Sequence, residues 1–137
     1  MRVVFADTCF WIALANPGDD LHAKAKELYA SLVTARIVTT ELVFVEFLNY
    51  ASERGSKARD DATALIRQVE SAANCDVIPH STMRYKQAMK RYEQYNDKGW
   101  SLTDCDSMLA MRSVGTKEIL TYDHHFEQDG CIALLRN

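Results

Sequence analysis

Hydrophobic and polar positions along the chain form blocks that predict strands and helices in turn. Short continuous apolar runs, such as Val3 to Ala6, have no polar side and are typical of strands buried on both faces. Longer blocks repeat apolar residues at helical spacing, as at Ala62, Ile66 and Val69, and again at Tyr85, Met89 and Tyr92. Strands are predicted at 3–6, 36–39, 76–78, 118–122 and 131–135, and helices at 10–15, 21–33, 41–54, 60–73, 82–95 and 102–113.

This alternation of strands and helices predicts an α/β fold with a mainly parallel sheet covered on both faces. A chain of 137 residues, 47% of them hydrophobic, suits one domain over residues 1–137, and two prolines and five glycines leave no long linker. In such sheets ligands bind beyond the carboxyl ends of the strands, where the strand order reverses. We therefore look for chemistry at the residues that follow the strands.

Composition narrows the class of protein further. No apolar run approaches the ~18–20 residues that span a bilayer, and the N-terminus lacks the pattern of a signal peptide, so we expect a soluble, cytoplasmic protein with no membrane partner. The four cysteines form no CxxC pair and are expected to be reduced. The formal net charge of −3 argues mildly against a nucleic-acid partner, unless the acids are gathered where cations neutralise them.

Four acidic residues stand in positions that favour a site. Asp7 and Asp123 directly follow the first and fourth predicted strands, so they would share one crevice if those strands are neighbours. Glu46 lies in a helix that is apolar on nearly every side, where an unpaired carboxylate is costly. Asp104 is three residues after Ser101, in the arrangement of a capping box. Turn formation, a salt bridge and helix capping remain alternative explanations for Asp7, Glu46 and Asp104 respectively.

Converging carboxylates repel one another, and burial raises the pKa of each. Mg²⁺ and Mn²⁺ relieve this repulsion because they prefer carboxylate and water oxygens. Such ions orient a phosphodiester and activate water for its hydrolysis. The chain has no phosphate-cradling GxxxxGK[ST] or GxGxxG motif, so cleavage of a polyanion fits better than use of a bound nucleotide.

With these four positions in view, the chain resembles the PIN-domain family, and within it the VapC-type toxins of toxin–antitoxin pairs. The stretches that carry the resemblance are "VFADTCFWIALANPGDDLHAKA", "IVTTELVFVEFLN", "WSLTDCDSMLAM" and "ILTYDHHFEQDGCIALL". The resemblance runs nearly end to end. It implies a Rossmann-like sheet of five parallel strands in the order 3-2-1-4-5, and a Mg²⁺- or Mn²⁺-dependent endoribonuclease.

The resemblance also implies roles and partners. The acidic residues that match the family's catalytic and metal-binding positions are Asp7, Glu46, Asp104 and Asp123. Thr8 and Thr121 match positions that support the site through hydroxyl hydrogen bonds. The implied partners are an RNA substrate (tRNA, rRNA or mRNA), a small antitoxin that threads a segment into the acidic cleft, and a second copy in a homodimer.

Two features depart from a simple four-acid picture. Asp106 stands where the VapC subgroup usually has an apolar residue; we expect it to face solvent, with a supplementary metal role or altered packing as the alternatives. His124 and His125 follow Asp123 at once and suggest a histidine metal site, but adjacent side chains rarely point at one ion. We expect Asp123 to carry the chemistry, His125 to hold the turn and His124 to lie on the surface.

Three other functions are less well supported by the residues. A phosphatase of the haloacid-dehalogenase type would need an acid or threonine two residues after Asp7, where Cys9 stands. A phospho-receiver domain would need an aspartate at the end of the third strand, where Pro79 and His80 stand. A catalytically weak PIN-fold module that binds RNA or protein is disfavoured by the presence of all four acids.

Overall fold

The computed structural model describes residues 1–137 and is built on a sheet of five parallel strands in the order β3-β2-β1-β4-β5. The strands are β1 (Val3–Ala6), β2 (Arg36–Thr40), β3 (Cys75–Ile78), β4 (Glu118–Leu120) and β5 (Ile132–Ala133). Phe5 of β1 pairs with Val38 of β2 on one side and Ile119 of β4 on the other. The predicted order 3-2-1-4-5 is confirmed, and the strands before Asp7 and Asp123 are neighbours.

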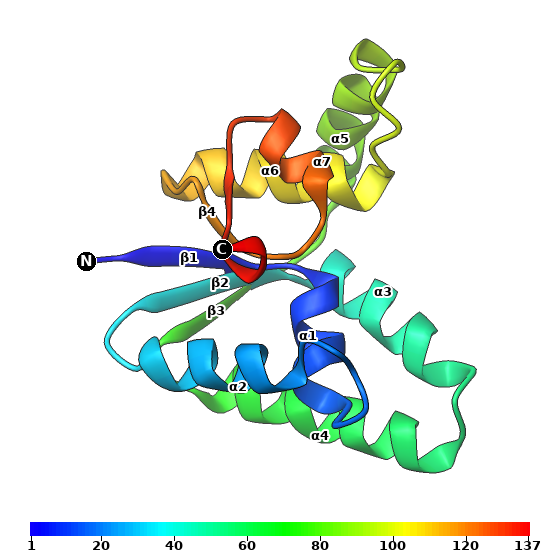
Figure 1. The fold of residues 1–137 in the computed structure, drawn as a ribbon. Helices are drawn as coiled ribbons and strands as arrows, with labels where there is room; N and C mark the ends of the chain where they lie inside the picture. Colours follow the sequence, from blue (N-terminus) through cyan, green and yellow to red (C-terminus); the bar gives the residue numbers. More distant parts are fainter.

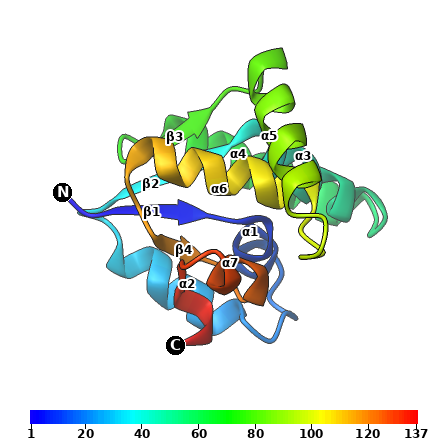
Figure 2. The ribbon, with the colours of Figure 1, turned by 90° about the horizontal axis from the view of Figure 1, so that it is seen from above.

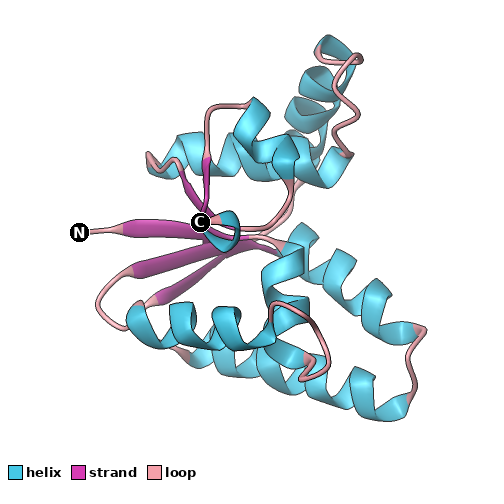
Figure 3. Ribbon diagram, viewed as in Figure 1, coloured by secondary structure: helices cyan, strands magenta, loops and turns pink.

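Helices cover both faces of the sheet (Figures 1 and 3). They are α1 (Thr8–Ala15), α2 (His22–Ser31), α3 (Glu41–Ser52), α4 (Ser56–Ser71), α5 (Thr82–Gln94), α6 (Leu102–Val114) and α7 (His124–Gln128), followed by the 3₁₀ turn Leu134–Arg136. In Figure 1, α1, α2 and α4 lie below the sheet, and α5, α6 and α7 lie above it. Seen from above, α6 runs alongside β1, and α5 packs against α6 at a steep angle (Figure 2).

The central strands are buried because they have apolar side chains on both faces. Val4, Phe5 and Ala6 of β1 and Ile119 and Leu120 of β4 have no exposed surface. This arrangement holds the carboxyl ends of β1, β2 and β4 rigidly side by side, which is where α1 and α3 begin. No helix combines the length and the apolar character needed to cross a bilayer.

Several element boundaries differ from the predictions by a few residues. The fourth strand ends at Leu120 rather than residue 122, and the short helix α7, which the sequence did not predict, follows it. Helix α3 ends at Ser52 rather than residue 54, and Gly55, with φ +91°, is the N-cap residue of α4. Residues 134 and 135 belong to a 3₁₀ turn rather than to the last strand.

Helix α5 packs with an unexpected face inward. The predicted apolar stripe included Tyr85, Met89 and Tyr92, yet these side chains are exposed. The inner face instead carries Arg84 and Arg91, because α5 lies against two carboxylates, those of Asp106 and Asp129. A polar residue that finds a charged partner can be buried, and hydrophobic periodicity does not register such a partner.

Candidate functional site

A cleft of about 620 Å³ opens at the carboxyl ends of the strands, and all four predicted acids line it. Asp7 follows β1, Glu46 comes from α3, Asp104 from the first turn of α6, and Asp123 from the turn between β4 and α7. The remaining lining residues are Thr8, Cys9, Ile12, Tyr50, Gly99, Ser101, Tyr122 and His125. The acids are thus brought together from four separate elements by the reversal of strand order at β1.

Asp7 is the most buried of the four acids. It is the N-cap residue of α1, and its carboxylate Oδ2 accepts a hydrogen bond of 2.9 Å from the Thr121 hydroxyl. Burial, together with the nearby carboxylates of Asp104 and Glu46, raises the pKa of Asp7 to about 7, although hydrogen bonds from Thr8 and Thr121 oppose the shift. At neutral pH, therefore, Asp7 needs a cation beside it to be fully ionised.

The Thr121 hydroxyl organises this corner of the cleft. It donates to Asp7, accepts the backbone N–H of Asp123 at 3.1 Å, and lies 3.2 Å from the Cys9 sulfur. Cys9 in turn accepts the N–H of Tyr122 at 3.3 Å. Desolvation raises the pKa of the Cys9 thiol to about 12, so it is protonated and can donate to Thr121. Because these donors fill its acceptor positions, the Thr121 hydroxyl directs its proton onto Asp7.

Asp104 has two functions that the sequence suggested separately. Ser101 caps α6 by accepting the N–H of Asp104 at 3.0 Å, and Asp104 Oδ2 accepts the N–H of Ser101 at 3.1 Å, which completes the predicted capping box. The same oxygen lies 3.1 Å from His125 Nδ1 and faces the cleft. Burial, with the charge of Asp123, raises the pKa of Asp104.

Glu46 is less buried than the apolar character of its helix predicted. Val45 and Leu48 of α3 are exposed, so the helix has a free outer face and only one side of it enters the core. Glu46 is half-buried at the cleft and forms no hydrogen bond or ion pair within the chain. Its carboxylate is therefore available to a substrate, a water molecule or a cation.

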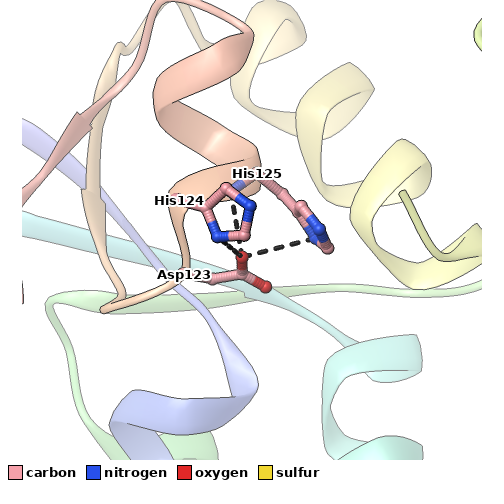
Figure 4. Close-up of side chains that lie close together, drawn as sticks. All are labelled: Asp123, His124 and His125. Atoms are coloured by element: carbon pink, nitrogen blue, oxygen red, sulfur yellow. Dashed lines mark hydrogen bonds and ion pairs between the residues drawn. The ribbon is translucent and has the colours of Figure 1, made fainter. Parts of the chain in front are cut away.

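Asp123 and the two histidines form a compact group at the start of α7 (Figure 4). Asp123 Oδ1 accepts the backbone N–H of His125 at 2.9 Å and lies 3.3 Å from His125 Nδ1 and 3.8 Å from His124 Nδ1. One ligand atom from each of the three residues lies within 4.8 Å of the others. The His124 side chain is 63% exposed, in agreement with its predicted place on the surface.

Asp106 does not face solvent, and that prediction is wrong. Only 1% of its surface is exposed, and both carboxylate oxygens lie 2.9 Å from Nη2 of Arg84 on α5. Asp106 does not line the cleft. The prediction failed because α5 covers this side of α6 and supplies the compensating charge.

The donor set of the cleft fits a hard divalent cation. Four carboxylates from separate elements offer only oxygen ligands, which suits Mg²⁺ or Mn²⁺. The Thr8 hydroxyl beside them is buried and has no hydrogen-bond partner within the chain. A buried hydroxyl without a partner is costly, so its position at the acids favours hydration by a cation's water shell.

Comparison with known families decides the classification: the PIN-domain model matches residues 4–129. The chain belongs to the PIN-domain family. All four acids of the cleft lie within the matched residues.

Individual relatives of this PIN domain are similar over nearly their whole length. The 23S rRNA-specific endonuclease VapC20 of Mycobacterium tuberculosis is 28% identical over 131 residues, which cover 95% of this chain and 96% of the relative. The crystal structure of VapC20, described as a sarcin-ricin loop cleaving toxin, superposes with a TM-score of 0.83 at 26% identity, covering 94% of this chain and 96% of that one. VapBC2 of Rickettsia felis, solved bound to a promoter DNA fragment, shares the fold with a TM-score of 0.61 at 14% identity, over 93% of this chain and 92% of its own.

The PIN-domain cleft also has residues that the sequence did not single out. Tyr50 and Tyr122 line it, and each ring is covered by an arginine: Arg54 lies 3.6 Å from the Tyr50 ring centre and Arg136 lies 4.8 Å from that of Tyr122. Tyr50 comes one turn after Glu46 on α3, and that spacing could have identified it. Cys9 carried no such signal, because its role depends on Thr121 across the sheet.

Proposed function

We propose that this PIN domain is a Mg²⁺- or Mn²⁺-dependent endoribonuclease that acts in the cytoplasm as the toxin of a toxin–antitoxin pair. The observation that carries the proposal is the convergence of Asp7, Glu46, Asp104 and Asp123 in one cleft. The end-to-end similarity to the 23S rRNA-specific endonuclease VapC20 supports RNA as the substrate. A ribosomal RNA stem-loop is therefore the first substrate to test, followed by tRNA.

In this proposal Asp7, Asp104 and Asp123 hold the cations, and the Thr121 hydroxyl fixes the orientation of Asp7. A bound Mg²⁺ or Mn²⁺ supplies positive charge that orients the phosphodiester, acidifies water and stabilises the leaving oxygen. Glu46 accepts a proton from the attacking water, because it is the one acid of the four with no hydrogen bond or ion pair within the chain. Water attack on phosphorus leaves a 5′-phosphate and a 3′-hydroxyl.

Arg54 and Arg136 would help to hold RNA at the rim of the cleft. Each presents a guanidinium above a tyrosine ring, and such a pair can contact a phosphate and a base together. Tyr122 is 50% exposed, so its ring is accessible to a nucleotide. Arg136 also pairs with Glu127 at 3.0 Å, so the uncompensated positive charge of the two comes from Arg54.

Glu46→Gln is expected to reduce RNA cleavage by at least about 100-fold, since it removes the proton acceptor. The melting temperature should stay within a few degrees of wild type, because Glu46 is half-buried and unpaired. The assay uses an rRNA stem-loop with Mg²⁺, with Mn²⁺ and with EDTA, and identifies the termini of the products. Cleavage in EDTA, a 2′,3′-cyclic phosphate, or full activity of Glu46→Gln would contradict the mechanism.

A small antitoxin would be the partner of the same cleft. The cleft is acidic and open to solvent, and a segment with a basic side chain would neutralise its carboxylates as a cation does. The exposed Val45 and Leu48 on the outer face of α3 offer an apolar surface beside it for the rest of such a partner.

We also propose a homodimer through the outer face of α5. Tyr85, Met89 and Tyr92 are spaced as one stripe and remain 46%, 39% and 49% exposed. A straight apolar stripe can pack on its own copy across a two-fold axis. Met89→Glu is expected to give a monomer in light scattering, whereas the matched control Lys90→Glu, on the adjacent face, stays dimeric. A wild-type monomer at tens of micromolar would contradict this interface.

A further inference from the structure

We propose that Asp123, His124 and His125, together with Asp104, form a nitrogen–oxygen site for a borderline transition metal of the zinc class, distinct in donor set from the all-oxygen nuclease site beside it. Adjacent histidines alone would be weak evidence for such a site. The structure adds two carboxylates from different elements: Asp123 lies near both imidazoles, and Asp104 of α6 contacts that of His125.

The distances are close to those that zinc requires. Ligand atoms in a tetrahedral zinc site with bonds of about 2.0–2.1 Å lie roughly 3.3 Å apart. His125 Nδ1 is 3.3 Å from Asp123 Oδ1 and 3.1 Å from Asp104 Oδ2. His124 Nδ1 is 3.8 Å from Asp123 Oδ1, so a small rotation of an exposed side chain would bring it to bonding position. The ligand atoms of Asp123, His124 and His125 thus lie within 4.8 Å of one another, and Asp104, which contacts His125, would complete the set by moving toward the ion.

The group is also held in place and open to an ion from solvent. The backbone N–H of His125 fixes Asp123 Oδ1 at 2.9 Å, and the N–H of Ser101 fixes Asp104 Oδ2 at 3.1 Å. Both carboxylates are thus oriented before a metal arrives, which favours binding. The two imidazole rings lie side by side next to the Asp123 carboxylate, with centres 4.6 Å apart (Figure 4), and the ring of His124 is mostly exposed.

The donor types separate this site from the magnesium site. Imidazole nitrogen suits Zn²⁺, Ni²⁺ and Cu²⁺, whereas Mg²⁺ and Mn²⁺ are held mainly by oxygen. Asp104 and Asp123 belong to both sets, and an ion bound by the histidines would draw both away from the nuclease cation. Zinc would then inhibit RNA cleavage by competition; this consequence, unlike the binding itself, rests on the proposed nuclease function.

The binding test uses untagged protein and does not depend on activity. Zn²⁺ is titrated by calorimetry, and Co²⁺ by its visible absorption, which reports a tetrahedral site with nitrogen ligands. Wild type is expected to bind one ion per chain, and His124→Gln to bind it at least about 10-fold more weakly. The control His80→Gln removes an exposed histidine that does not line the cleft and should bind as wild type does. Equal affinity of wild type and His124→Gln, or no binding below millimolar Zn²⁺, would overturn the proposal.

The activity test then asks whether the two sites compete. With saturating Mg²⁺, Zn²⁺ should inhibit RNA cleavage by wild type, and about 10-fold more Zn²⁺ should be needed for His124→Gln, whose activity without Zn²⁺ equals that of wild type. Equal inhibition of the two proteins would overturn the competition. If wild type cleaves no RNA with Mg²⁺ or Mn²⁺, the nuclease proposal fails, and calorimetry still decides the zinc site.

Discussion

Asp7→Asn is expected to abolish metal-dependent cleavage of RNA and, in the absence of metal, to make the protein more stable than wild type at pH 8. The loss of activity should exceed about 100-fold, because even groups that only support a metal ligand change metal affinity by 10–100-fold. The gain in stability follows from burial. The pKa of Asp7 rises from 3.8 to about 7, because the carboxylate is desolvated and faces Asp104 and Glu46.

The pH dependence has a definite sign. In the unfolded chain the Asp7 carboxyl loses its proton near pH 4, whereas in the folded chain it keeps it until about pH 7. The folded state binds more protons between these values, so the free energy of unfolding of wild type falls as pH rises from about 4 to about 7. Asparagine has no such proton. The free energy of unfolding of Asp7→Asn, relative to that of wild type, should therefore increase by roughly 2–3 kcal/mol between pH 5 and pH 8.

Urea unfolding in EDTA at pH 5 and pH 8 measures this difference. Added Mn²⁺ should raise the stability of wild type more than that of the variant, because a cation neutralises the carboxylate that the variant lacks. A variant that is less stable than wild type at pH 8, or a difference independent of pH, would show that Asp7 is not held in a desolvated acidic cluster.

The second large effect is expected at Arg84, outside the cleft. Arg84→Met removes the only ion-pair partner of Asp106, whose carboxylate is 1% exposed. An uncompensated buried charge costs about 3–5 kcal/mol, so the variant should unfold at markedly lower urea. The double variant Arg84→Met, Asp106→Val should recover most of that loss, because a buried pair can be exchanged for apolar side chains at little cost.

Urea unfolding of both variants and of one control tests the buried pair. Arg2→Met removes an ion pair with Glu118 whose side chains are 48% and 30% exposed, and it should change stability by no more than about 1 kcal/mol. If Arg84→Met costs as little as Arg2→Met, the Asp106 carboxylate is neutral or hydrated. If the double variant is no more stable than the single one, Arg84 contributes through packing rather than through charge.

The sequence predicted correctly those parts of the site whose positions follow from short-range sequence spacing or from the connectivity of a parallel sheet. Residues that follow parallel strands share one edge, and with the strand order implied by the family resemblance this rule predicted that Asp7 and Asp123 share one crevice. The capping box of Ser101 and Asp104 depends on residues three positions apart and was likewise visible. Helix α7 escaped prediction because five residues are too few to show a periodicity.

The parts that were predicted wrongly depend on contacts between distant segments. Arg84 and Asp106 are 22 residues apart, and a pattern that treats charged residues as exposed places both on the surface. The same rule placed Tyr85 and Tyr92 of α5 inside, although they are exposed. Glu46 was expected to be more buried than it is, because the apolar outer face of α3 does not reveal whether another element covers it.

The inverted packing of α5 also fixes its position relative to α6 and to the end of α7. Arg84 and Arg91 are seven residues apart. Their ion pairs with Asp106 and Asp129 are therefore two turns apart on α5, roughly 10 Å along the helix. Arg84 meets Asp106 and Arg91 meets Asp129 at 2.5 Å, and sliding α5 by one turn would break both contacts at once. An interface made only of apolar side chains would tolerate such a shift far better than one that contains two ion pairs. The two arginines therefore prevent α5 from sliding against α6, the helix that carries Asp104.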